Sequence, residues 1–254
     1  MKLPLHEYIV ALVEAVALTL LICRLAYSGL IARYKWFFTY VVLDLCETLT
    51  PFLIRSSQWY GNVFFAIQCL KLLTYVLIVF ELYSILLRDL RGLAIVAKRY
   101  SSVALLVAVL LSALVVSALP HQSNPLRQLF YIEIPIISSL VLFILLIAGF
   151  IAYYPVPLHK NALVYAIGYV VFFICKVTGL FILNLHLDTS LRVFSTAFMV
   201  SSLACIIFWT IFLSGAGESG QVAVGSRWSG PAKQEQVLLR LREINTTLLR
   251  ARPK

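Results

Sequence analysis

The chain has 254 residues, of which 61% are hydrophobic and only 13% are charged, and its mean hydropathy is +0.94. A soluble chain of this length cannot bury so much apolar surface, so the composition excludes an ordinary soluble domain and predicts a polytopic membrane protein. The formal net charge is +10, but the basic residues lie at the ends of apolar runs and not along one soluble face, which argues against nucleic acid as a partner.

Several apolar runs have the length of membrane-spanning helices. A bilayer core about 30 Å thick needs roughly 20 apolar residues per helix. Seven runs of this kind cover 7–27, 36–54, 62–87, 100–119, 129–153, 160–183 and 191–213. Turn-forming residues separate several of them, such as Ser28-Gly29 and Tyr60-Gly61-Asn62. We therefore expect an all-α fold, a bundle of seven transmembrane helices over residues 1–213.

The distribution of Lys and Arg gives the expected orientation of this bundle. Basic residues gather in the loops that follow the first, third and fifth runs, and again in the tail. The first two of these loops contain Arg24, Arg33, Lys35, Arg88, Arg91, Lys98 and Arg99. Because loops rich in Lys and Arg stay in the cytoplasm, we expect the N-terminus outside and the C-terminus in the cytoplasm.

Ionisable residues also lie inside the predicted spans, where a charged group costs about 2.5–3.5 kcal/mol. Several fall at a similar depth in the outer half of the bundle, and polar residues lie on the same helical faces. The candidate residues are Glu14, Asp44, Glu47, Gln68, Lys71, Tyr75 and Lys176. We expect them to form a polar core in which carboxylates of the first and second spans neutralise Lys71 and Lys176. Glu81 and Arg24 lie near the cytoplasmic span ends, where snorkelling to the interface would leave them without a role.

The tail after the last span divides into two parts. Residues 214–232 are rich in Gly and Ser and are expected to form a flexible linker. Residues 233–252 repeat apolar side chains at helical spacing and predict a basic amphipathic helix. Its basic residues, which can contact anionic lipid of the inner leaflet or a cytoplasmic partner, are Arg240, Arg242, Arg250 and Arg252. A short coiled coil between protomers is the alternative, so a homo-oligomer stays open.

No motif for a metal, a cofactor or a catalytic reaction stands out. His6, His121 and His186 belong to the predicted outer side, together with Glu7, Glu133 and Asp188. Their spacing is not that of a metal site, so we expect no metal and no cofactor. The chain has no nucleophile motif, phosphate-binding loop or dinucleotide fingerprint, and nothing positively supports an enzyme.

Three segments carry a resemblance that spans most of the chain. They are RYKWFFTYVV (33–42), VFELYSILLRD (79–89) and LLRLREINTTLLRAR (238–252). Together they resemble a group of uncharacterised bacterial seven-helix integral membrane proteins with no known activity. The resemblance implies a location in the bacterial plasma (inner) membrane and implies no mechanism.

The polar core leaves several functions open. An intramembrane ionisable residue usually marks a ligand or ion pathway, although ion pairs can also simply fix the packing of helices. Our first expectation is a small-ligand-responsive membrane sensor whose tail relays the response. The alternatives are a secondary transporter or proton-coupled carrier, in which Asp44, Glu47 and Lys71 exchange partners, and a structural or scaffolding membrane protein.

Overall fold

The computed structural model describes residues 5–54, 57–88, 90–118, 125–154, 156–185, 191–224 and 231–250. These residues are nearly all helical. The helices are α1 (Leu5–Tyr27), α2 (Lys35–Leu53), α3 (Ser57–Leu86), α4 (Arg91–Ala118), α5 (Pro125–Tyr153), α6 (Lys160–Leu185), α7 (Leu191–Phe212) and α8 (Pro231–Arg250). The prediction of an all-α chain is confirmed, although α3 begins before the predicted Tyr60–Asn62 turn and includes it.

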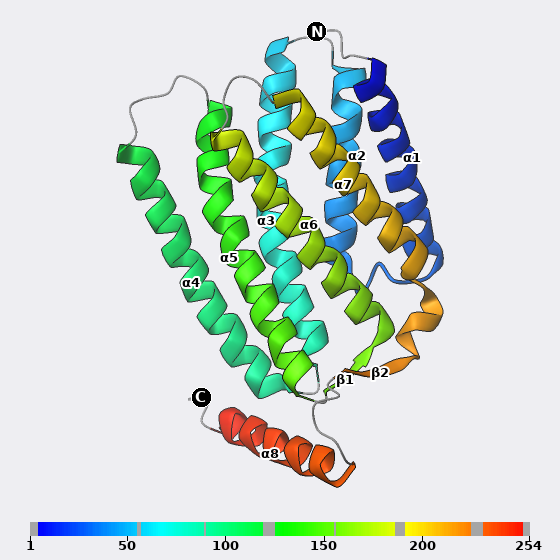
Figure 1. Cartoon of the computed structure of the whole chain (residues 1–254), viewed down its shortest axis with the longest axis vertical. Coiled ribbons are helices and arrows are strands. Elements are labelled where there is room, and N and C mark those ends of the chain that lie inside the picture. The colour runs from blue at the N-terminus through cyan, green and yellow to red at the C-terminus, as the bar shows by residue number, and fades with distance from the viewer. Residues whose placement is uncertain are drawn as a thin grey trace.

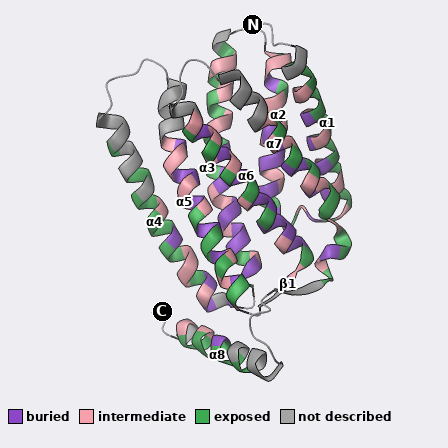
Figure 2. Ribbon diagram, in the orientation of Figure 1, coloured by how far each residue is buried: buried purple, intermediate pink, exposed green. Residues whose placement is uncertain are grey.

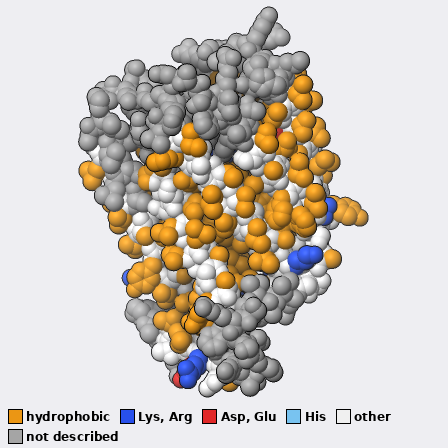
Figure 3. All heavy atoms as spheres, viewed as in Figure 1, with side chains coloured by type: hydrophobic (Ala, Val, Ile, Leu, Met, Phe, Trp, Pro, Cys, Tyr) orange, Lys and Arg blue, Asp and Glu red, His pale blue; other side chains and the backbone are white. Residues whose placement is uncertain are grey.

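Five helical segments of the described chain are long and apolar enough to cross a membrane. They are Tyr8–Tyr27, Lys35–Leu53, Trp59–Leu86, Ile132–Tyr153 and Lys160–Ile182. The surface agrees with lipid contact, because the described side chains visible in Figure 3 are mostly hydrophobic, and the visible Lys and Arg side chains lie in the half of the molecule that is nearer α8. The membrane class is therefore confirmed, whereas the count of seven spans and their orientation stay predictions.

Six helices form a closed ring. Along the ring α1 packs against α2, α2 against α3, α3 against α5, α5 against α6, α6 against α7, and α7 returns to α1. Helix α4 lies outside the ring against α5 and α3, and α8 lies across one end of the bundle (Figure 1). We call this end the α8 end and the opposite one, where the chain begins, the N-terminal end.

A short antiparallel sheet lies at the α8 end (Figure 1). Strand β1 (Val156–His159) precedes α6, and β2 (Gln221–Val224) follows the 3-10 helix η1 (Gly215–Glu218). The strands pair from Val156 with Val224 to His159 with Gln221. The segment predicted as a flexible linker thus starts with ordered elements, because its backbone finds a partner strand far away in the sequence.

Aromatic side chains fill the centre of the ring, where buried residues of α2, α3, α6 and α7 meet (Figure 2). The largest fully buried side chains include Phe37, Tyr40, Tyr75, Tyr165, Tyr169 and Trp209. Helix α6 approaches α7 closely because it has a glycine at the contact. A Cβ atom on Gly168 would lie 2.1 Å from Nε1 of Trp209, so only glycine admits the indole there.

Candidate functional site: a buried charge network

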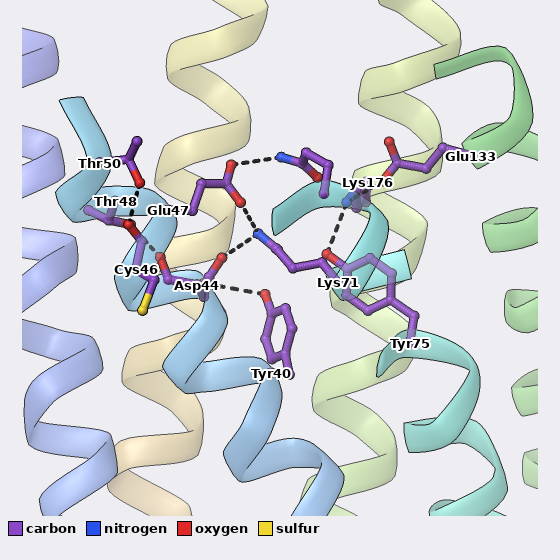
Figure 4. Close-up of polar contacts among 11 residues, drawn as sticks. Tyr40, Asp44, Cys46, Glu47, Thr48, Thr50, Lys71, Tyr75, Glu133 and Lys176 are labelled. Carbon is purple, nitrogen blue, oxygen red and sulfur yellow. Dashed lines mark hydrogen bonds and ion pairs between the residues drawn. The ribbon is translucent and has the colours of Figure 1, made fainter. Parts of the chain in front are cut away.

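Lys71 of α3 lies between two carboxylates of α2 (Figure 4). Its Nζ atom is 2.5 Å from Oδ1 of Asp44 and 2.7 Å from Oε2 of Glu47. The other Glu47 oxygen accepts a hydrogen bond of 2.8 Å from Nε2 of Gln68. Residues three apart share one face of a helix, so Asp44 and Glu47 face Gln68 and Lys71 across the α2–α3 contact.

The two carboxylates differ in their surroundings. The Asp44 side chain is 9% exposed, and the Tyr40 hydroxyl donates a hydrogen bond of 3.4 Å to its Oδ2 atom. The Glu47 side chain is 22% exposed. Because α2 runs from the α8 end to the N-terminal end of the bundle, Glu47 also lies nearer the N-terminal end of the bundle than Asp44 does. Of the two carboxylates, Glu47 is therefore the one that a molecule from outside the bundle reaches first.

Lys176 of α6 forms a second, separate pair with Glu133 of α5. Its Nζ atom is 2.5 Å from Oε1 of Glu133, and these two side chains are only 8% and 5% exposed. The same ammonium donates a hydrogen bond of 2.9 Å to the Tyr75 hydroxyl and lies over the Tyr75 ring. The expectation that the first or second span supplies the Lys176 partner is corrected, because α5 packs directly against α6 and provides Glu133.

Glu14 of α1 is buried near the first cluster of charges, which consists of Asp44, Glu47 and Lys71. Its side chain forms a hydrogen bond with Ser202 of α7, and it lies within electrostatic range of Asp44, Glu47 and Lys71. Among the described residues no ion pair joins Glu14 to a lysine. The expected contribution of the first span to the neutralisation of Lys71 therefore involves no ion pair among the described residues, and Glu14 interacts with Lys71 only at longer range.

The two clusters differ in charge balance. Glu133 and Lys176 bring one carboxylate and one ammonium together. In the first cluster the single ammonium of Lys71 contacts two carboxylates, those of Asp44 and Glu47, and the buried carboxylate of Glu14 lies nearby. If all four groups were ionised, this cluster would hold a net negative charge in a low-dielectric environment, which is strongly unfavourable. Protons or a cation have to balance it.

Glu81 of α3 is a functional residue that the sequence interpretation missed. It is buried, and its Oε1 atom accepts a hydrogen bond of 3.2 Å from the backbone nitrogen of Trp36. Its Oε2 atom accepts one of 3.1 Å from the Tyr165 hydroxyl. Glu81 therefore caps the N-terminus of α2 from another helix and does not snorkel. One feature of the sequence could have indicated this role: the residue before α2 is Tyr34, which does not cap the helix with its own side chain, so the cap has to come from elsewhere.

Arg24 also has a defined role, since it binds the end of α7. Its Nε atom donates a hydrogen bond of 2.7 Å to the carbonyl oxygen of Leu213, and its Nη2 atom donates one of 3.2 Å to that of Ile211. An arginine at a helix C-terminus satisfies free carbonyls and favours the helix dipole. Arg24 therefore joins α1 to α7 at the α8 end.

A cluster centred on Glu218 closes the α8 end of the bundle. The Glu218 carboxylate forms an ion pair with Arg33, and it accepts hydrogen bonds of 2.7 Å from the Tyr34 hydroxyl and 2.9 Å from Nδ2 of Asn161. Burial, together with the hydrogen bond to Glu218, raises the pKa of Tyr34 well above its usual value. We call Arg33, Tyr34, Asn161 and Glu218 the Glu218 cluster.

The tail helix α8 packs against α4 at the α8 end. Its buried contact is Leu241, whereas Arg240 and Arg242 are exposed. The side chain of Arg250 and the whole of Arg252 lie outside the described residues. The exposed arginines therefore remain available to lipid headgroups or a partner.

Metal ligands are not grouped in the described part of the chain. It contains no set of three or more His, Cys, Asp or Glu side chains that could hold a metal ion. His121, His186 and Asp188 lie outside the described residues, as do the side chains of His6 and Glu7. Glu133, which the sequence placed with the histidines, instead pairs with Lys176.

Comparison with known proteins adds no assignment: no protein family, curated protein or solved structure matches this chain. Its function has to be argued from the buried charges.

Proposed function

We propose that this protein is a proton-coupled membrane carrier. In this proposal Glu14, Asp44, Glu47 and Lys71 form a site that holds a proton and releases it when a small substrate binds or moves. The observation that carries the proposal is the excess of carboxylates over ammonium groups around Lys71. A proton is the smallest species that can neutralise such an excess, and it needs no preformed cavity.

We call Glu14, Asp44, Glu47 and Lys71 the Lys71 cluster. The contrast with Lys176 argues against a purely structural role for this cluster. A device that only fixes helix packing needs equal numbers of opposite charges, as Glu133 and Lys176 have. The Lys71 cluster carries additional carboxylates at a position where each unneutralised charge is unfavourable. Such an arrangement is costly unless the additional carboxylates bind something.

The geometry around Lys71 allows the ammonium to exchange partners. Its Nζ atom already contacts both Asp44 and Glu47. When one carboxylate takes up a proton, its attraction to Lys71 weakens, and the ammonium keeps the other one. Gln68 can follow the change at Glu47, because its amide donates to an ionised carboxylate and its carbonyl oxygen accepts from a protonated one.

Seven transmembrane spans with the N-terminus outside form part of the proposal. With this orientation the more exposed Glu47 faces the outer side and receives the proton first. We place the protein in the bacterial inner membrane, with Arg240 and Arg242 of α8 at the anionic inner leaflet.

Infrared spectroscopy of the purified protein tests the proton site without knowledge of the substrate. At neutral pH we expect the wild type to show the C=O stretching band of a protonated buried carboxyl. The band should disappear or shift in at least one of the Glu14→Gln, Asp44→Asn and Glu47→Gln variants. The exposed Glu243→Gln on α8 is the matched control and should leave the band unchanged. A wild-type spectrum without this band would contradict the proposal.

Proteoliposome transport then tests the carrier. We expect an imposed pH gradient to drive proton movement, reported by an internal pH-sensitive dye, on addition of at least one compound from a panel of small amines and organic acids. Asp44→Asn should abolish this movement. Glu243→Gln should retain it.

A ligand-responsive sensor is the second candidate, and the contact between α8 and α4 favours it. Asn245 of α8 accepts a hydrogen bond from the backbone of Gly92 at the start of α4. A tail attached directly to the bundle can pass a movement of α4 to a partner. Tight binding of a compound without any flux would support the sensor over the carrier.

A further inference from the structure

Two polar groups in the aromatic centre of the bundle are buried without a partner. The side chains of Tyr169 in α6 and Trp209 in α7 belong to residues that are 0% exposed. Within the described part of the chain, neither the Tyr169 hydroxyl nor the Trp209 Nε1 atom has a hydrogen-bond partner. Buried polar groups in folded proteins are nearly always hydrogen-bonded, so each such exception requires an explanation.

The two groups are neighbours, and this suggests a shared explanation. The ring centroids of Tyr169 and Trp209 are 4.8 Å apart. An indole N–H is a donor only, whereas a phenol hydroxyl both donates and accepts. A single water molecule can accept from Trp209 and also bond to Tyr169, which would satisfy both groups at once.

Tyr169 also lies between two tyrosines that lead to carboxylates. Its ring centroid is 6.3 Å from that of Tyr40 and 5.0 Å from that of Tyr165. The Tyr40 hydroxyl donates to Asp44, and the Tyr165 hydroxyl donates to Glu81. The rings of the three tyrosines therefore form a row between the Lys71 cluster and Glu81.

We propose that Tyr169 and Trp209 bind a buried water molecule that completes a proton path from Asp44 to Glu81. This inference rests on the proposed function, since it extends the route of the proton that the Lys71 cluster holds. Tyr40, Tyr169 and Tyr165 are the relay groups, and Glu81 is the acceptor on the side of the α8 end.

Each step of the path conserves protons and needs no redox partner. A protonated Asp44 gives its proton to the Tyr40 oxygen, while the Tyr40 hydroxyl passes its own proton onward. The same exchange occurs at Tyr169, the water molecule and Tyr165, so that every hydroxyl is neutral again when the proton reaches Glu81. No bond other than O–H bonds forms or breaks.

The surroundings of Glu81 suit a terminal acceptor. The backbone N–H of Trp36 at the start of α2 and the Tyr165 hydroxyl of α6 both donate hydrogen bonds to the Glu81 carboxylate. The titratable groups around it are Tyr34, which precedes α2, and Tyr165 and Tyr169 of α6. Glu81 is therefore bonded directly to the last tyrosine of the path, at the end of α2 that lies toward the α8 end.

Proton flux into proteoliposomes tests the path with a matched control. Tyr169→Phe removes one buried hydroxyl from the path, and Tyr83→Phe removes another that lies outside the path and donates to the Phe143 carbonyl oxygen. We expect Tyr169→Phe and Glu81→Gln to lower the flux by roughly 100-fold, the order expected for the loss of a proton-transfer group. Tyr83→Phe should retain wild-type flux. Equal flux in Tyr169→Phe and Tyr83→Phe, with Asp44→Asn inactive, would overturn the path and leave the carrier intact.

The water site has a separate test that needs no transport. The difference between ultraviolet resonance Raman spectra of the wild type and Trp209→Phe isolates the Trp209 indole. We expect the hydrogen-bonding marker band of a bonded N–H, and we expect it to shift when Tyr169→Phe is introduced. A marker band of a free N–H in the wild type would overturn the water site, whether or not proton flux is found.

Discussion

The side-chain oxygen of Asn245 lies 2.6 Å from the backbone nitrogen of Gly92 and accepts its hydrogen bond. The same oxygen also accepts a longer bond of 3.4 Å from the nitrogen of Leu93. Helix α8 thereby caps the start of α4 with an asparagine, a residue type that usually caps its own helix. The close approach of the two helices requires glycine, because a Cβ atom on Gly92 would lie 2.6 Å from the backbone carbonyl oxygen of Asn245.

We predict that Gly92→Ala and Asn245→Ala loosen α8. Gly92→Ala forces the two backbones apart, and Asn245→Ala removes a cap worth about 1 kcal/mol. Hydrogen–deuterium exchange should therefore become faster at the start of α4 and along α8. Gly149→Ala is the control, because a Cβ atom there meets nothing within 4 Å. Unchanged exchange in Gly92→Ala would show that α8 does not depend on this contact.

Lys71→Met should destabilise the protein more than Lys176→Met. Removal of one partner of a buried ion pair costs about 3–5 kcal/mol, because a buried charge is left unpaired. Lys71→Met leaves two carboxylates, Asp44 and Glu47, without their ion-pair partner, whereas Lys176→Met leaves only Glu133 unpaired. The midpoint of thermal unfolding in detergent measures the difference.

Double variants separate pairing from other effects of these lysines. Glu133→Gln should recover most of the stability lost in Lys176→Met, since it removes the unpaired buried charge of the Glu133 carboxylate. Asp44→Asn should recover only part of the loss in Lys71→Met, because Glu47 remains. Full recovery in the second case would mean that Glu47 is already neutral.

Glu81→Ala should unfold α2 at its start more readily than Glu81→Gln. Alanine leaves the first backbone N–H groups of α2 without an acceptor, whereas the glutamine carbonyl can still accept one hydrogen bond. We expect a loss of about 1–2 kcal/mol for alanine, the size of a lost helix cap. Faster exchange of the Trp36 and Phe37 amides would locate the effect, and equal exchange in the two variants would contradict the cap.

Tyr34 should make the protein less stable at alkaline pH. Its pKa is raised by burial and by Glu218, so above about pH 10, the ordinary tyrosine pKa, the unfolded chain loses a proton that the folded chain keeps. Stability therefore falls as pH rises, by at most about 1.4 kcal/mol per pH unit for this one group. Tyr34→Phe should reduce the slope. Tyr27→Phe, at a side chain 96% exposed, should not.

Composition and periodicity were enough to predict a helical membrane protein, because apolar helices long enough to cross a bilayer leave a strong local signal. They also placed Asp44 and Glu47 on one face of α2, and Gln68 and Lys71 on one face of α3, which the structure turns toward each other. Helical spacing is a property of one segment and can be read directly from the sequence.

Contacts between distant segments could not be predicted in the same way. The Lys176 partner depends on how α5 and α6 pack, and Glu133 sits in a segment that was read as belonging to the outer side. Glu81 was missed because the helix terminus that it caps belongs to α2, 45 residues away in sequence. The pairing of β1 with β2 likewise joins segments that no local pattern connects.

The closed ring has a consequence for biogenesis. Helix α1 leaves the ribosome well before α7, yet its neighbours in the ring are α2 and α7. Glu14 can bond to Ser202, and Arg24 to the carbonyl groups of Leu213 and Ile211, only after α7 has been synthesised. A nascent chain that stops before α7 therefore leaves these polar groups of α1 without the partners that the folded protein gives them.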